Sequence, residues 1–214
     1  VSDSDFLKMW PDATQTQELL DQAKHGDAHA VDALLAKHRE PIRRMIDMRL
    51  DPAIVQRLDA SDVVQEVMIE ASRRLQDYLK SPAMPFHLWL RHIAKDHLID
   101  AHRRHHQAQK RGVDREQPIH RPAWSDHSSL ELAGQLMDQD LTPASAAIQA
   151  EMQRRLQEAI TQLDEDDREV ILMRHYEMLA NQEVAAALGL TEAAASMRYL
   201  RAVRKLRDLL APNA

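Results

Sequence analysis

Histidine is the side chain with the widest chemistry in this sequence, and half of the histidines lie in one segment. The segment FHLWLRHIAKDHLIDAHRRHH, Phe86–His106, holds six of the twelve histidines, together with a tryptophan and four Lys or Arg residues. Neutral imidazole is a common metal ligand, and it can act as a general acid or base near neutral pH. The segment raises three hypotheses: a metal site, a basic surface for nucleic acid, or a helix of the protein core.

The spacing of these histidines argues against a metal site. Four of them recur every five residues: His87, His92, His97 and His102. On a helix, each is rotated by about 140° from the one before, so they do not share a face. His102, His105 and His106 do share one, but no carboxylate completes a ligand set there, and H-E-x-x-H is absent. We therefore predict no metal, no cofactor and no catalytic residue, which makes a metal-dependent nuclease the less favoured alternative.

The composition favours a helical protein. The 214 residues include only four glycines, aromatic residues make up 4%, and the apolar fraction of 44% is enough for a core. Cysteine is absent, which excludes disulfides and thiolate metal sites and fits a reducing cytoplasm. No apolar run approaches the ~18 residues needed to span a bilayer. We therefore predict a cytoplasmic protein without membrane insertion.

Positive charge is concentrated in two places although the net charge is negative. The formal net charge of −6 argues against a histone-like binder, but local patches decide nucleic-acid binding. Residues 86–115 carry seven Lys or Arg against three Asp, and residues 191–210 carry five against two acids. These two basic patches favour the nucleic-acid hypothesis.

Apolar residues at helical spacing predict the elements that position these patches. A helical pattern runs through Thr14–Met48 with a break at His25–Asp27. Another helix is expected to begin after Asp59, a candidate N-cap, and to end near Tyr78. The proline-containing segment Ser81–Pro85 then separates it from the histidine-rich helix.

The helical pattern fades in the middle of the chain. Pro, Gly, Ser and Asp are frequent there, although Leu130–Met137 has the spacing of a short helix. Such a long connection is unusual inside one compact domain. We predict an all-α fold of two helical lobes, at residues 13–110 and 144–212, joined by a flexible linker at 111–143.

The C-terminal segment NQEVAAALGLTEAAASMRYLRAVRKLRDLL, residues 181–210, predicts a helix-turn-helix. Asn181 is a candidate N-cap for a short helix, Gly189 can supply a left-handed turn residue, and Thr191 is a candidate N-cap for the next helix. The second helix has an apolar stripe: Ala195, Tyr199, Ala202 and Leu206. The second helix of this motif typically enters the DNA major groove. The alternative is a helical hairpin whose arginines are merely solvated.

Three motifs follow one another along the chain: DASDVVQEVMIEASRRL at 59–75, FHLWLRHIAKDHLIDAHRR at 86–104, and the helix-turn-helix region that begins LDEDDREVIL at 163. In this order they resemble bacterial RNA polymerase sigma factors of the sigma-70 family, in the extracytoplasmic-function (ECF) group. The first is similar to the family's polymerase-clamp helix, the second to its promoter-melting segment, and the third to the domain that reads the −35 element. Ala193-Ala194-Ala195, which replaces the usual Gly-Thr-Val, resembles ECF groups of planctomycete-like bacteria.

The resemblance implies contacts with core RNA polymerase. The D-x-x-Q-E core of the clamp helix corresponds to Asp62, Gln65 and Glu66, which lie at i, i+3 and i+4 and so share one helix face. This face is expected to dock on the beta and beta-prime subunits. The alternative for Asp62 is a capping role at the start of its helix.

The resemblance also implies contacts with promoter DNA. Expected contacts with the −10 element are Tyr78, Phe86, Trp89, Arg91, Lys95, Asp96, Arg103 and Arg104. Expected contacts with the −35 element are Thr191, Glu192, Ala194, Ser196, Met197, Arg198, Arg201 and Arg204. Trp89 has two interpretations, base stacking or core packing. Asp96 stands where the family often has asparagine, and a carboxylate cannot donate a hydrogen bond.

The function implied is that of a sigma factor, a non-enzymatic protein that binds core RNA polymerase and directs promoter-specific initiation. An anti-sigma factor is a further candidate partner. The alternative function is a helix-turn-helix transcription regulator whose N-terminal lobe senses a ligand or partner. That alternative leaves the order of the first two motifs without explanation.

Overall fold

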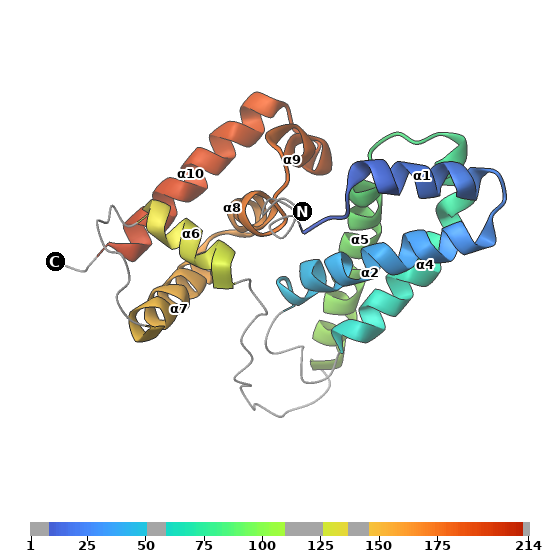
Figure 1. The fold of residues 1–214 in the computed structure, drawn as a ribbon. Coiled ribbons are helices and arrows are strands. Elements are labelled where there is room, and N and C mark those ends of the chain that lie inside the picture. Colours follow the sequence, from blue (N-terminus) through green and yellow to red (C-terminus); the bar gives the residue numbers. More distant parts are fainter. Residues whose placement is uncertain (1–8, 51–58, 110–125, 137–145, 212–214) are drawn as a thin grey trace. The chain divides into compact units, whose positions relative to one another are not determined.

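The computed structural model describes residues 9–50, 59–109, 126–136 and 146–211, and regular secondary structure in these ranges is entirely helical (Figure 1). The helices form two compact units, one of Met9–Ala123 and one that contains Trp124–Ala214. The predicted all-α fold with two helical lobes is thereby confirmed. None of the helices in these ranges is long and apolar enough to cross a membrane.

Three of the described helices in the first unit begin at aspartate caps. The described elements of this unit are α1 (Ala13–Lys24), α2 (Ala28–Asp47), α4 (Ala60–Lys80) and α5 (Phe86–Gln109). The carboxylates of Asp12, Asp27 and Asp59 accept hydrogen bonds from N–H groups in the first turns of α1, α2 and α4, at 2.9, 2.9 and 2.8 Å. These N–H groups have no partner inside their helix, so the caps fix where each helix starts. Gly26, with φ 91°, makes the predicted break before α2.

The first unit has a core between α2, α4 and α5, and α1 packs on α2. Fully buried aliphatic side chains include Leu34, Ile42, Met45, Ile46, Val67, Ala71, Leu75, Leu88, Leu90 and Ala94. On α2 and α4 most of these positions are separated by one or two helical turns, so each of these helices buries one stripe and exposes the opposite face. On α5, Leu88 and Leu90 are two residues apart, so the start of this helix is buried on more than one side. Burial of one large aliphatic side chain is worth about 1.5–3 kcal/mol. The core therefore fixes which faces of α4 and α5 point outward.

The second unit is built around its last helix. Its described elements are α6 (Asp126–Leu136), α7 (Ala146–Gln162), α8 (Glu165–Ile171), the π-helical turn η2 (Leu172–Tyr176), α9 (Asn181–Leu188) and α10 (Glu192–Leu210). α10 contacts α6, α7, α8 and α9. Ala195, Ala202 and Leu206 of the predicted stripe are fully buried, and Tyr199 is half-buried. The predicted apolar stripe therefore is the inner face of α10.

Helix α6 lies inside the segment 111–143 that the sequence predicts as a flexible linker. Leu132 and Ala133 are buried, and α6 contacts α7, η2 and α10. The Ser129 hydroxyl also lies 3.1 Å from the Tyr176 hydroxyl of η2, within hydrogen-bond distance. A helix this short is marginal alone in water, so packing against the second unit stabilises it. The second unit thus includes this part of the expected linker; residues 110–125 and 137–145 lie outside the described ranges.

Each unit contains a histidine whose pKa is lowered by its surroundings: His38 is buried and His175 is half-buried. His38 on α2 is 1% exposed, its Nδ1 lies 2.8 Å from the Leu34 carbonyl oxygen, and its ring packs edge-on against Phe86. Burial lowers the pKa of His38 to about 4. In the second unit, burial and then the neighbouring Arg174 lower the pKa of His175 to about 4. Both side chains are therefore neutral in the folded protein at pH 6.

We expect the first unit to lose stability between pH 6.5 and 4. The folded-state pKa of His38 lies below its unfolded value, so the unfolded chain takes up the proton first as the pH falls. At pH 5 the loss is about 2 kcal/mol relative to pH 8, from a shift of that size. Hydrogen exchange of α2 amides at pH 8 and pH 5 measures it. His38→Asn, whose amide can still donate to Leu34, should flatten the profile, whereas His29→Asn at an exposed position of α2 should leave it unchanged.

Candidate nucleic-acid interface

The polar face of α4 points outward. Asp62 and Gln65 are exposed and Glu66 is half-buried, whereas Val63, Val64 and Val67 face the core. The alternation follows from the helix period, since residues 62, 65 and 66 lie on the side opposite the buried valines. Ile69, also exposed, extends the face by one turn. The structure therefore leaves all three predicted polymerase contacts accessible.

Glu66 links α4 to the basic end of α5. Its Oε2 lies 3.2 Å from Nη2 of Arg104 and 3.3 Å from Nδ1 of His97. The hydrogen bond from Arg104 is the main cause that lowers the pKa of Glu66. All three side chains are partly exposed, so these contacts stabilise the fold little and can be exchanged for contacts with a partner. A predicted polymerase contact and a predicted DNA contact thus meet at one point.

The aromatic residues predicted to contact the −10 element form a cluster. Tyr78 and Phe86 are buried, with ring centroids 5.5 Å apart, and Trp89 is half-buried at 4.8 Å from Tyr78. The Tyr78 hydroxyl donates a hydrogen bond to the Met84 carbonyl oxygen at 2.9 Å. This cluster anchors the loop between α4 and α5. Tyr78 and Phe86 therefore support the loop from beneath, and only Trp89 keeps a surface on which a base could stack.

Arg91 lies in the core and not on the predicted DNA surface. Its side chain is fully buried, at 0% exposure. The cause is helix phase, because Arg91 shares a face of α5 with Ala94 and Leu98, both of which are buried. This corrects the prediction that Arg91 contacts phosphates. Lys95 and Asp96 stay partly or fully accessible.

The basic end of α5 keeps Arg103 and Arg104 on the surface. Both side chains are exposed; Arg103 lies 3.6 Å from Asp100 one turn earlier, and Arg104 reaches Glu66. Exposed ion pairs of this kind are weak, so both guanidinium groups can turn to phosphate. Four of the eight predicted −10 residues are therefore accessible charged side chains on α5: Lys95, Asp96, Arg103 and Arg104. Trp89 is the fifth accessible residue, and a base could stack on it.

The second unit contains the predicted helix-turn-helix. Gly189 adopts φ 64° and ψ 33°, the left-handed conformation that ends α9. The Thr191 hydroxyl accepts a hydrogen bond from the Ala194 N–H at 3.2 Å and caps α10. α9 itself begins differently from the prediction. Its N-cap is Ala180, whose N–H donates to Glu183 at 2.8 Å, while the Asn181 side chain donates to the Glu192 carbonyl oxygen at 3.0 Å.

Asn181 thus joins the two helices of the motif instead of capping the first one. This bond spans from the start of α9 to the start of α10 and holds the turn closed from the outside. All the predicted −35 residues lie on exposed or half-buried positions at the start and along the outer sides of α10: Thr191, Glu192, Ala194, Ser196, Met197, Arg198, Arg201 and Arg204.

Acidic residues at the start of α8 hold the basic residues of α10. Arg198 lies 3.1 Å from Asp166, and Arg201 lies 3.3 Å from Asp167. The Lys205 ammonium group donates to both Asp164 and Asp167 at 2.6 Å. The bond from Lys205 is the main cause that lowers the pKa of Asp164 to about 2. These ion pairs lie along one side of α10, and Asp167 is the buried acid among the three carboxylates.

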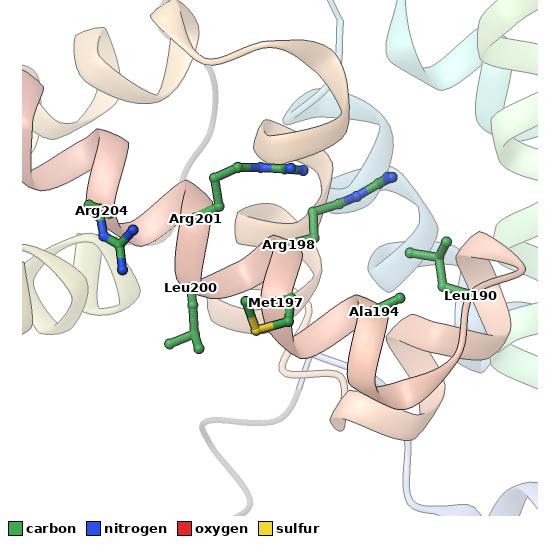
Figure 2. A pocket seen from close by; sticks show the side chains of 7 residues that line it. All are labelled: Leu190, Ala194, Met197, Arg198, Leu200, Arg201 and Arg204. Carbon is green, nitrogen blue, oxygen red and sulfur yellow. The ribbon is translucent and has the colours of Figure 1, made fainter.

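The outward surface of α10 also carries a groove. It has a volume of about 460 Å³ and is lined by Leu190, Ala194, Met197, Arg198, Leu200, Arg201 and Arg204 (Figure 2). Leu200 and the acids of α8 are absent from the predicted set. The acidic run Asp164–Asp167 and the i+3 spacing of Leu200 from Met197 are the sequence signals that could have found them.

No group of three or more His, Asp or Glu side chains in the described part of the chain has the geometry to hold a metal ion. The side chains of His105 and His106 lie outside this description. Among the histidines of α5, His87 packs against the ring of Trp10, His92 is half-buried, and His97 contacts Glu66.

Comparisons with known proteins match both units. A family model described as "ECF sigma factor" matches residues 13–210. The chain is 29% identical over 206 residues to the ECF RNA polymerase sigma factor SigD of Mycobacterium tuberculosis, covering 94% of this chain and 89% of that protein. It is 27% identical over 202 residues to the RNA polymerase sigma-H factor of Pseudomonas aeruginosa, covering 92% and 95%.

Among solved structures, the fold is similar to that of CnrH in complex with the cytosolic domain of CnrY. The TM-score is 0.57 at 24% sequence identity, and the match covers 95% of this chain and 100% of that one. At this identity the likeness concerns the fold.

Proposed function

The chain belongs to the ECF sigma factor family, whose members are transcription initiation factors and not enzymes, and we propose that it binds core RNA polymerase through α4 and reads promoter DNA with α5 and α10. The predicted ECF family is thereby confirmed, while the planctomycete-like subgroup stays a prediction. A restraining anti-sigma partner also stays a prediction.

The observation that carries the proposal is the extent of the family match. It runs from residue 13 to residue 210 and so includes the helices of both units. A transcription regulator that shared only the helix-turn-helix would leave α1, α2, α4 and α5 without a counterpart. The outward polar face of α4 adds support, because nothing in the first unit's own core requires Asp62 or Gln65.

At the −10 element, the proposed surface differs from the predicted one. Trp89, Lys95, Asp96, Arg103 and Arg104 remain as contacts, since each has an accessible side chain. Arg91 is excluded by burial, and the buried cluster partners of Trp89 act as the support that orients it. A base extruded from the duplex would stack on Trp89 at the mouth of the loop, with the arginines on the phosphates.

At the −35 element, α10 would enter the major groove with its outward side. Thr191, Glu192 and Ser196 are polar residues of its first turns, and Arg204 is an exposed cation farther along. Arg198 and Arg201 are paired with acids of α8 in the free protein, which places both guanidinium groups on one side of α10.

Promoter-specific transcription with bare core polymerase tests the proposal. We expect the chain and core RNA polymerase together to produce discrete run-off transcripts from selected genomic fragments, and core polymerase alone to produce none from them. Fragments without selected promoters are the control. If the chain binds DNA but gives no initiation with any core enzyme from its host, the regulator alternative replaces this function.

A further inference from the structure

The outermost face of α10 is apolar where a DNA-reading helix usually carries hydrogen-bonding groups. Ala193, Met197 and Leu200 lie at i, i+4 and i+7, so they share one face. Met197 is 66% exposed and Leu200 is 53% exposed. The next residue on this face is Arg204 at i+11. Neighbouring exposed apolar side chains of this size indicate a surface that is covered by a partner.

Charge identifies the partner as DNA. Three arginines line the same groove as Met197 and Leu200, and two of them are held in place by carboxylates of α8. In Figure 2, Met197 and Leu200 leave the helix on one side, and Arg198 and Arg201 leave it on another. We call Ala193, Met197 and Leu200 the apolar strip. An apolar strip flanked by cations complements the major groove, whose floor bears base edges and whose walls bear phosphates.

The chemistry of the strip selects what it can read. Ala, Met and Leu side chains donate and accept no conventional hydrogen bond, so they cannot distinguish the amino and carbonyl groups of base edges. The one apolar group that a base presents in the major groove is the 5-methyl of thymine. Arginine reads guanine with two N–H groups at once, and Arg198 and Arg201 each direct one terminal nitrogen at a carboxylate of α8, which leaves their other N–H groups for phosphate.

We propose that α10 recognises the −35 element through the 5-methyl groups of thymines, which pack against Met197 and Leu200, while Arg204 and the paired arginines contact the backbone. This inference rests on the proposed function and names the chemistry by which the same helix chooses its sequence. Thr191, Glu192 and Ser196 lie beside the strip and set its register on the duplex.

Replacement of thymine by uracil tests the proposal, because it removes only the methyl group. The −35 element is first selected from a random library with the holoenzyme of this chain and core polymerase. Each thymine of that element is then replaced by uracil in turn, and holoenzyme affinity is measured by competition. We expect one or two positions to lose affinity about fourfold each, the effect of withdrawing one CH₂-sized apolar contact. Uracil in the spacer should have no effect.

Variants of the chain assign the effect to the strip. Met197→Ala and Leu200→Ala should each reduce the preference for thymine over uracil at one position, and Leu209→Ala, at another exposed apolar position of α10, should preserve it. Because all three side chains are exposed, the variants are expected to fold, which circular dichroism verifies. When a sensitive thymine is replaced by cytosine, affinity is expected to fall, and replacement by 5-methylcytosine at the same position should recover part of that affinity.

The outcomes separate this proposal from the function on which it rests. A holoenzyme that selects no −35 element, or gives no transcripts, contradicts the proposed function itself. A holoenzyme that initiates normally but binds thymine and uracil duplexes equally overturns the methyl readout and leaves the function standing. The methyl readout is also overturned if Met197→Ala lowers activity without changing the preference for thymine over uracil. In that case Met197 and Leu200 would contact a protein and not the DNA.

Discussion

Asp167→Asn is expected to destabilise the second unit by about 2–3 kcal/mol, while Asp166→Asn, one residue earlier, changes its stability by less than about 0.5 kcal/mol. The Asp167 side chain is 1% exposed and accepts from Arg201 and Lys205, whereas the Asp166 side chain is 69% exposed and pairs with Arg198. The neutral amide keeps the shape of Asp167 but removes the negative charge that both cations face. The burial of Asp167, together with its second cationic partner, therefore accounts for the larger expected effect.

Hydrogen exchange measures this prediction unit by unit. Amides of α8 and α10 should exchange faster in Asp167→Asn, and amides of α4 in the same molecule serve as the internal control. This readout is needed because a chain of two units need not unfold in one step. Equal effects of the two substitutions would mean that the buried position of Asp167 contributes nothing beyond an ordinary surface pair.

The same contrast has a consequence for DNA binding. Asp167 pairs with Arg201 and Lys205 on one side of α10; Asp167→Asn removes the charge that Arg201 faces, while Lys205 keeps its bond to Asp164. A variant that still folds should bind DNA of any sequence somewhat more tightly, because Arg201, released from its carboxylate, adds to the nonspecific phosphate term. The steeper dependence of binding on salt would reveal it.

Local chemistry explains which parts of this structure could be predicted from the sequence. Asp59, Gly189 and Thr191 were assigned correctly because a cap or a left-handed turn depends on a few neighbouring residues. Asn181 shows the limit of that approach. It has the right residue type for a cap, yet a carbonyl group on the next helix offers its amide a better partner.

Tertiary packing explains what the sequence left open. Arg91 reads as a surface cation, and only the neighbours of its helix face show that it lies in the core. Helix α6 has too few residues to be stable alone, so its existence depends on α7, η2 and α10. The ion pairs between α8 and α10 join residues more than thirty positions apart, and no local pattern links an acidic run to a basic helix at that distance.

The candidate interface divides in the same way. The polar face of α4 follows from helix period alone, so Asp62, Gln65 and Glu66 were placed together correctly. Helix period does not predict which aromatic residues support the loop and which can contact DNA. Tyr78, Phe86 and Trp89 are all aromatic, and what separates them is how deeply each side chain is buried. Function in this chain thus depends on outward faces, which periodicity predicts, and on burial, which requires the structure.

Asp62→Lys is expected to lower the affinity for core RNA polymerase by about 10- to 100-fold. Reversal of one charge in a complementary interface costs up to several kcal/mol, and each loss of about 1.4 kcal/mol in binding free energy lowers the affinity tenfold. Asp62 is the sharpest position on the polar face of α4. Its side chain is exposed, whereas Glu66 also bonds to Arg104 and His97, so that its replacement would disturb α5 as well. Asp62→Asn should give an intermediate loss if charge is the cause.

Two controls make this prediction specific to the face. Glu40→Lys imposes the same change of charge at an exposed position of α2 and should leave the affinity within about twofold, by the weakness of remote surface charges at physiological salt. Because Asp62 lies in the first turn of α4, its replacement by lysine is expected to cost up to about 1 kcal/mol of helix stability. A tenfold loss of affinity at 25 °C in protein that circular dichroism shows to be folded exceeds what that cost can explain. Unchanged affinity in Asp62→Lys would remove the α4 face from the interface and would leave the polymerase to dock on another surface of the first unit.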